Sequence, residues 1–202
     1  TNSIGVYTEL NSIFTNDGII NGLSSSSIGI FANGNTVAEN TGTITTNNLG
    51  IYGSGDGING ATVNNSGDIY VNTAGKVGIF VEKNGTTANL TGGTINALST
   101  VGNTIGVHAE DTGVINLSGS NINLLGNNSV GLSLAQNSKL KLTNGNISVG
   151  NSGTGIYSKD STIDMIGYSV TITMGNEGIG LYLDNSTLNA TANQNLNISY
   201  NG

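Results

Sequence analysis

The sequence predicts an all-β fold: a single-chain parallel β-helix, or β-solenoid, of about eight coils, with about 25 residues and three short strands in each coil. The first observation is a glycine that recurs between two apolar residues and is followed, two positions later, by a side chain that is usually aromatic. Successive copies lie 21 to 28 residues apart, with a mean of 25, at Gly5, Gly29, Gly50, Gly78, Gly106, Gly131, Gly155 and Gly180. The second observation is that the intervals hold short segments in which apolar and polar residues alternate, as in a strand with one buried face.

The unit from residue 130 to residue 154 shows this plan most clearly. It contains three alternating segments, at residues 130–134, 139–142 and 146–149. Most residues in the intervals between them are Asn, Gly, Ser and Thr, which favour turns. The adjacent units repeat the plan at residues 105–109, 114–117, 121–125, 154–158, 162–165 and 169–174. Since no apolar stripe of helical period and length occurs, each unit is predicted as three strands and three turns.

A coil of this size is too thin to bury its own inner face, and it becomes stable when the next coil pairs with it in parallel. We expect the apolar residues on both sides of each glycine to face the interior, which places the glycine and the aromatic residue outside. The third strand is expected to add an interior column of Ile44, Ile69, Ile95, Ile122, Ile147 and either Val170 or Ile172. Because neither end supplies a polar cap, we expect residues 1–202 to be one segment of a longer β-helix, cut at both ends.

The composition argues against several classes of protein. A net charge of −7, with five basic residues that are all lysine, argues against nucleic acid as a partner, because phosphate binding needs clustered basic residues. No apolar run approaches the ~20 residues of a membrane helix, so this segment is not expected to insert into a membrane. The absence of cysteine excludes disulfides and thiolate metal sites. We expect a monomer without a cofactor.

Two stretches carry a family resemblance, Thr154-Gly-Ile-Tyr-Ser-Lys-Asp-Ser-Thr162 and Ile179-Gly-Leu-Tyr-Leu-Asp-Asn-Ser-Thr187. Together with the coil length and the low-charge composition rich in Asn, Gly, Thr and Ser, they resemble the passenger domains of type V autotransporters, and most closely the large outer-membrane adhesins of fusobacteria. The resemblance implies an extracellular stalk or head on the bacterial cell surface. It implies that a signal peptide and a C-terminal outer-membrane barrel lie outside this segment. It further implies a role in virulence, through adhesion to a protein or glycan on host cells or other bacteria.

A column of aromatic residues is the best candidate for a partner-binding surface. A ring follows every recurring glycine except Gly131, and the rings are expected on one outer face: Tyr7, Phe31, Tyr52, Phe80, His108, Tyr157 and Tyr182. Such a strip, with bare glycines beside it, offers a sugar or a protein a flat apolar contact. The alternative is that stacked aromatic side chains stabilise the sheet and shield its backbone.

Seven of the 12 acidic residues are expected along one edge, in the turns that follow the glycine strands: Glu9, Asp56, Glu82, Glu110, Asp111, Asp160 and Asp184. This acidic edge attracts cations or a basic partner. The alternative is a solvated edge that keeps the solenoid soluble, in which Lys83 and Lys159 dilute the charge. No loop offers the six to eight converging oxygens of a tight calcium site, so no metal site is expected.

Catalysis finds little support in the sequence. His108 is the single histidine, Glu110 lies two residues beyond it on the same face, and no recognisable motif places a nucleophile nearby. We therefore do not expect an enzyme, and the resemblance to autotransporter passenger domains implies an adhesin segment. One alternative is the scaffold β-helix of a polysaccharide-acting enzyme or a phage tailspike. The other is the head of a trimeric autotransporter, which phrases like Asn128-Ser-Val-Gly-Leu-Ser133 resemble, although such heads have shorter repeats.

Overall fold

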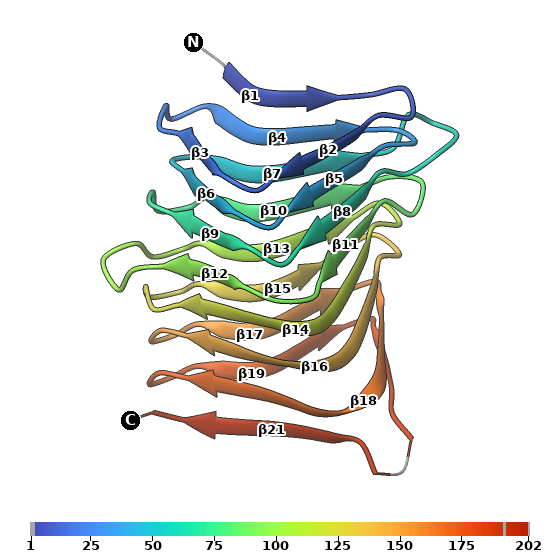
Figure 1. Cartoon of the computed structure of the whole chain (residues 1–202). Helices are drawn as coiled ribbons and strands as arrows, with labels where there is room; N and C mark the ends of the chain where they lie inside the picture. The colour runs from blue at the N-terminus through green and yellow to red at the C-terminus, as the bar shows by residue number, and fades with distance from the viewer. Residues whose placement is uncertain (1–2, 192, 202) are drawn as a thin grey trace.

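Eight coils stack along one axis in the computed structural model of the chain, from the N-terminal coil at one end to the C-terminal coil at the other (Figure 1). The structure describes residues 3–191 and 193–201, apart from the side chain of Tyr168. The regular elements of this part of the chain are all strands, and they pair in parallel. Accordingly, no helix in the described residues has the length and apolar character that crossing a membrane requires. The prediction of an all-β parallel β-solenoid with about eight coils is confirmed.

The first strand of each coil belongs to one eight-stranded sheet, which we call the first sheet. Each of its strands contains one of the recurring glycines, and neighbouring strands come from successive coils, as when Val77 pairs with Leu49 and with Ile105. The strands are β1 (Ser3–Thr8), β4 (Ser27–Asn33), β7 (Leu49–Ser54), β10 (Val77–Glu82), β13 (Ile105–Glu110), β15 (Val130–Leu134), β17 (Thr154–Lys159) and β19 (Ile179–Asp184).

The second and third strands of the coils belong to a larger second sheet. In the first four coils and the last coil they are separate strands: β2 (Ile13–Asn16), β3 (Ile19–Gly22), β5 (Val37–Asn40), β6 (Thr43–Thr46), β8 (Thr62–Asn65), β9 (Asp68–Val71), β11 (Thr87–Leu90), β12 (Thr94–Ala97), β20 (Thr187–Asn189) and β21 (Asn195–Tyr200). In the fifth, sixth and seventh coils they merge into β14 (Val114–Leu124), β16 (Lys139–Val149) and β18 (Thr162–Met174).

The prediction of three separate strands per coil is therefore wrong for these three coils. The predicted turn around residues 143–145 lies inside β16. Gly119 and Gly145 have φ angles of 137° and 147°, which only glycine adopts readily, and they let the backbone change direction while the strand continues. The pairing register shifts at the same places, between Leu117 and Asn121 and between Leu142 and Asn144.

Columns of apolar side chains fill the interior. The first sheet contributes the residue after each glycine, and Ile30 and Ile79 are fully buried there. The third strand contributes the predicted isoleucine column, in which Ile172 and not Val170 is the register partner of Ile147. The second strand adds a further buried column of Ala38, Val63, Ala88, Ile115, Leu140 and Ile163. Burying a large aliphatic side chain contributes about 1.5–3 kcal/mol before conformational entropy opposes it.

A short ladder of asparagines replaces part of this core in the first three coils. Asn16 and Asn40 each donate an amide hydrogen to the side-chain oxygen of the next asparagine, at 2.8 Å, and the ladder ends at Asn65, which donates to the carbonyl oxygen of Gly67 at 3.0 Å. Because each of these amide groups has an acceptor, the ladder avoids the cost of an unpaired buried donor. Leu90 continues the same column in the next coil.

The recurring glycines lie inside the solenoid, so the prediction that they lie on the outer face is wrong. Gly78 is buried. A Cβ atom added to it would lie 2.7 Å from Cγ2 of Ile95 and 2.6 Å from the carbonyl oxygen of Gly106. A third-strand isoleucine thus occupies the space that a side chain at this position would need. Because the glycine and the residue after it both face inward, the alternation of the strand is broken here, and the residue before the glycine turns outward.

The outer faces of the two end coils carry exposed apolar side chains, since no described residue covers them. In the first coil Leu10 and Ile13 are 81% and 74% exposed, and in the last coil Ile179 and Ile198 are 45% and 46% exposed. At the position of Ile198, by contrast, the inner-coil partners Ile172 and Ile147 are fully buried.

Candidate functional site

The predicted aromatic residues form one column on the outer face of the first sheet. Register pairing connects them from coil to coil in the order Tyr7, Phe31, Tyr52, Phe80, His108, Ser133, Tyr157 and Tyr182. The predicted alignment of the seven ring-bearing residues is therefore confirmed, and we call the column the aromatic ladder. Its role in binding stays a prediction.

The rings of the aromatic ladder stack on one another along the solenoid axis. The ring centroids of Phe31 and Tyr52 lie 4.7 Å apart with planes 11° from parallel, and those of Tyr52 and Phe80 lie 5.3 Å apart at 19°. Tyr157 and Tyr182 stack in the same way, at 5.3 Å and 4°. Tyr52 is therefore covered on both faces, by Phe31 and by Phe80, and presents its ring edge to the solvent. The contacts at the ends of this stack are less parallel, at 68° between Tyr7 and Phe31 and at 42° between Phe80 and His108.

A second apolar column, which the sequence reasoning missed, runs beside the aromatic ladder. It consists of the residues that precede the glycines, all aliphatic except Thr154: Ile4, Ile28, Leu49, Val77, Ile105, Val130, Thr154 and Ile179. These side chains are half-buried or exposed and lie outside the core cluster. They were expected inside, because simple alternation cannot reveal a strand in which two consecutive residues face inward. We call the two columns together the outer strip.

The aromatic ladder is interrupted at Ser133, where a hydroxyl takes the place of a ring. His108 leans toward this gap, with Nδ1 3.0 Å from Oγ of Ser133 and Nε2 3.3 Å from Oε2 of Glu110. The position of Glu110 on the same face as His108 was predicted. The contact between His108 and Ser133 was not predicted, because the two residues are 25 positions apart in the sequence.

Ser133, His108 and Glu110 resemble a nucleophile, a base and an orienting acid in their order of contact. Acyl transfer also requires free hydrogen-bond donors for the oxyanion. Here β15 is paired on both sides, with β13 and with β17, so its main-chain amide groups are used in the sheet. The contacts among these three residues hold the imidazole ring in place. The amide groups of β15 are not free to act as oxyanion donors.

The seven acidic residues of the predicted edge lie at the corner that follows the first sheet. Glu82 and Glu110 are register partners at the ends of β10 and β13. Asp184 ends β19 and lies 3.8 Å from the ammonium group of Lys159, its partner on β17. The other four stand in the turns that follow the strands: Glu9, Asp56, Asp111 and Asp160. Glu82, Glu110 and Asp184, at the strand ends, are adjacent to the aromatic ladder. The acidic edge therefore touches the outer strip at these three residues.

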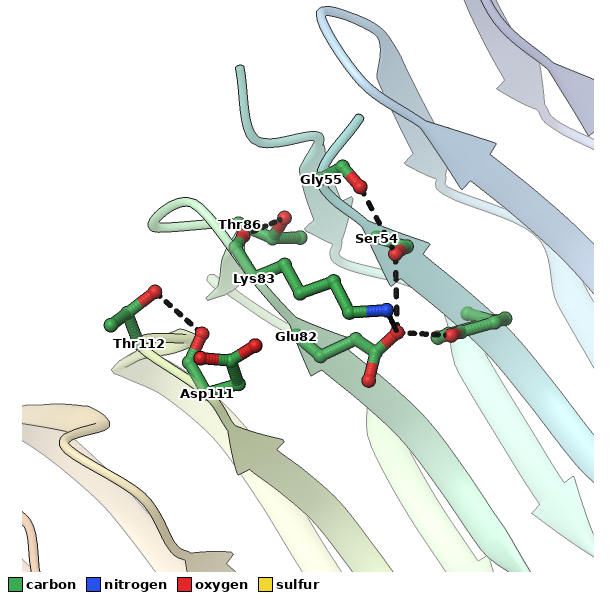
Figure 2. Close-up of polar contacts among 8 residues, drawn as sticks. Ser54, Gly55, Glu82, Lys83, Thr86, Asp111 and Thr112 are labelled. Carbon is green, nitrogen blue, oxygen red and sulfur yellow. Dashed lines mark hydrogen bonds and ion pairs between the residues drawn. The ribbon is translucent and has the colours of Figure 1, made fainter. Parts of the chain in front are cut away.

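Glu82 joins these two surfaces (Figure 2). Its Oε1 accepts hydrogen bonds from the hydroxyl groups of Tyr52 and Ser54, at 2.5 and 3.2 Å, and lies 2.9 Å from Nζ of Lys83. Burial favours a raised pKa for Glu82, but the hydrogen bonds from Tyr52 and Lys83 outweigh it, so the pKa is lowered. Burial and the adjacent carboxylate raise the pKa of Tyr52 to about 12. Glu82 is thus an ionised, internally paired residue, only 8% exposed.

Asp56 has a local structural role in the loop after β7. Its Oδ1 accepts hydrogen bonds from the backbone amides of Ile58 and Asn59, at 2.9 and 2.8 Å, and these two bonds lower the pKa of its carboxyl group. The loop thereby holds Ile58 out into solvent, where the side chain is 86% exposed. Nowhere in residues 3–191 and 193–201 do three acidic or imidazole groups converge as metal ligands.

The outer strip thus extends along the first sheet from the first coil to the last. It consists of the aromatic ladder and the column of residues that precede the glycines, on strands that pair in parallel within the first sheet. Comparison of the chain with protein-family models, with curated proteins and with solved structures finds no match.

Proposed function

We propose that this chain is a segment of a bacterial type V autotransporter adhesin, a rigid extracellular β-solenoid that attaches to a protein on host cells or on other bacteria. The observation that carries the proposal is the outer strip, an apolar surface that extends over all eight coils on one face. Isolated exposed apolar residues are ordinary on proteins, but long contiguous apolar patches mark interaction surfaces.

The geometry of the outer strip favours a protein partner. The stacked rings of Phe31, Tyr52 and Phe80 offer edges and not faces, and the column beside them offers methyl groups. Apolar side chains of a partner pack well against both, as they do in the apolar centre of protein interfaces. Two acids next to the aromatic ladder, Glu110 and Asp184, favour a partner whose rim carries lysine or arginine.

The rest of the fold suits rigid display. Each coil is hydrogen-bonded to its neighbours through every strand, and the eight coils extend for roughly 38 Å at the usual spacing between strands. A solenoid of this kind holds a binding face at a fixed distance from the surface to which it is attached. Extracellular location at the outer membrane is part of the proposal and is supported by the resemblance to autotransporter passenger domains.

The experiment is adhesion of the purified chain, coupled to fluorescent beads, to cultured epithelial cells and to bacteria. A variant with Val77→Thr and Ile105→Thr removes apolar surface from the centre of the outer strip while keeping β-branched side chains. We expect bead binding to fall at least tenfold. The matched control carries Leu98→Thr and Leu125→Thr, which change two exposed apolar residues outside the first sheet and should leave binding within twofold.

Equal melting temperatures for both variants and the parent chain are required for the comparison. If the parent chain binds no cell type, or if the strip variant binds as well as the control, the outer strip is not the adhesive surface.

A further inference from the structure

A polar groove of about 820 Å³ lies at the corner between the two sheets in the last four coils. It is separate from the outer strip, because its lining comes from the turns after the first sheet and from the first residues of β16, β18 and β20. The residues that matter for its chemistry are Asp111, Asn137, Lys139, Asp160, Thr162 and Asn185.

The fold holds this lining in two rows. The first row stands in the turns, where Asp111, Asp160 and Asn185 have φ angles of 45°, 48° and 48°. Asp and Asn tolerate this left-handed conformation best among residues with a side chain. The second row begins the second sheet, where Lys139 and Thr162 are register partners. Four coils give the groove a length of about 14 Å along the axis at the usual strand spacing.

The lining offers hydrogen-bond donors and acceptors in close alternation. Carboxylates only accept, the ammonium group only donates, and amide and hydroxyl side chains do both. Asn185 donates to Oδ1 of Asp160 at 2.6 Å, which fixes that carboxylate, and its second oxygen can accept a hydrogen bond from a ligand. A ligand with many hydroxyl groups satisfies such a surface, since each hydroxyl also donates and accepts.

We propose that this groove binds a neutral oligosaccharide, as a second site that goes beyond the outer strip. Two carboxylates against one ammonium group disfavour sulfated, sialylated or phosphorylated polymers. The lining includes no large apolar side chain, so a hydrophobic peptide or a lipid gains little from it. Metal ions are disfavoured because the lining contributes only two acidic groups.

The test uses the whole chain on a printed array of neutral, sialylated and uronic-acid-containing oligosaccharides. We expect binding to one or more neutral glycans and at least tenfold weaker binding by Asp160→Asn, which keeps the size and the turn conformation of the residue. The control is Asp164→Asn. Asp164 lies in the same coil and accepts a 2.7 Å hydrogen bond from Asn189, as Asp160 does from Asn185, but it is outside the groove.

Several results overturn the proposal: binding to no neutral glycan, binding restricted to acidic glycans, or equal loss with Asp160→Asn and Asp164→Asn. The two proposals fail separately. The variant with Val77→Thr and Ile105→Thr should keep its glycan binding, whereas Asp160→Asn, which lies in the groove and not in the outer strip, should keep within twofold the bead binding that Val77→Thr and Ile105→Thr reduce. Loss of glycan binding in the strip variant would show that the two surfaces are one site.

Discussion

The hydroxyl group of Tyr52 donates a 2.5 Å hydrogen bond to Glu82, which lies in the next coil and 30 residues further along the chain. This contact joins the aromatic ladder to the acidic edge. It also explains why a nearly buried carboxylate is tolerated at the end of β10, because Ser54 and Lys83 provide the remaining partners. The acidic edge is therefore an internally bonded structure at this point.

Tyr52→Phe removes this hydrogen bond while keeping the stacked ring. We expect a loss of about 1–2 kcal/mol in the free energy of unfolding, because the bond involves a charged acceptor and is only partly exposed. Chemical denaturation followed by circular dichroism measures the change. Tyr157→Phe is the matched control: its ring stacks on Tyr182, no hydrogen bond of its hydroxyl group is found in the described structure, and its effect should be close to zero. Equal effects of the two substitutions would contradict the assigned role of Glu82.

The same contact predicts how stability depends on pH. The pKa of Tyr52 is raised from 10.0 to about 12, so its contribution is complete below pH 10 and is lost as the pH rises through about 12. The pKa of Glu82 is lowered from 4.5, so its contribution is present above pH 4.5 and is lost as the pH falls below that value. Denaturation midpoints measured from pH 3 to pH 12 should thus show a plateau between these limits. In Tyr52→Phe the decrease above pH 10 should be smaller.

Gly78→Ala tests why glycine recurs in the first sheet. The new Cβ would lie 2.6 Å from a backbone oxygen and 2.7 Å from Ile95, and neither the paired strand nor the packed core can yield easily. We expect a loss of about 3 kcal/mol, at the upper end of overpacking effects. Gly18→Ala is the control, since nothing lies within 4 Å of its added Cβ and its φ is not left-handed, and it should be neutral or slightly stabilising. A small effect at Gly78 would mean that the glycine repeat has a cause other than packing.

Ser133 offers a test of the aromatic ladder as a stabilising structure. Ser133→Tyr supplies a ring between His108 and Tyr157, whereas Ser133→Ala only removes the hydroxyl group that contacts His108. We expect the tyrosine variant to exceed the alanine variant by about 1 kcal/mol in the free energy of unfolding, the usual worth of an aromatic pair. Thermal and chemical unfolding of both variants check this. If the tyrosine variant is no more stable than the alanine variant, stacking contributes little to stability. That result would favour binding over stability as the role of the aromatic ladder.

Several features of the fold could be predicted because they depend on local pattern. The strand around residues 130–134 was predicted with the bounds that β15 has, and the isoleucine column of the third strand follows from the same alternation. The merging of strands in β14, β16 and β18 could not be predicted, because Asn, Gly and Thr at a bend have the composition of a turn whether or not pairing continues across it.

The candidate site divides in the same way. The aromatic column could be predicted, since a constant offset from a recurring glycine places side chains in one register. The aliphatic column beside it, the pairing of Tyr52 with Glu82 and the approach of Ser133 to His108 could not. Each depends on which face a residue takes after the alternation breaks, or on contacts between residues 25 or 30 positions apart.

The sequence by itself determined the period, the number of coils and the identity of the residues that stack in columns, because a parallel solenoid repeats whatever its strands repeat. Only the tertiary structure decided which way the glycines face. Because glycine has no side chain, the alternation of apolar and polar residues does not show whether it faces inward or outward. Its direction is fixed by an isoleucine from the opposite wall, which packs directly against its backbone. That packing turns the preceding residue outward and creates the outer strip.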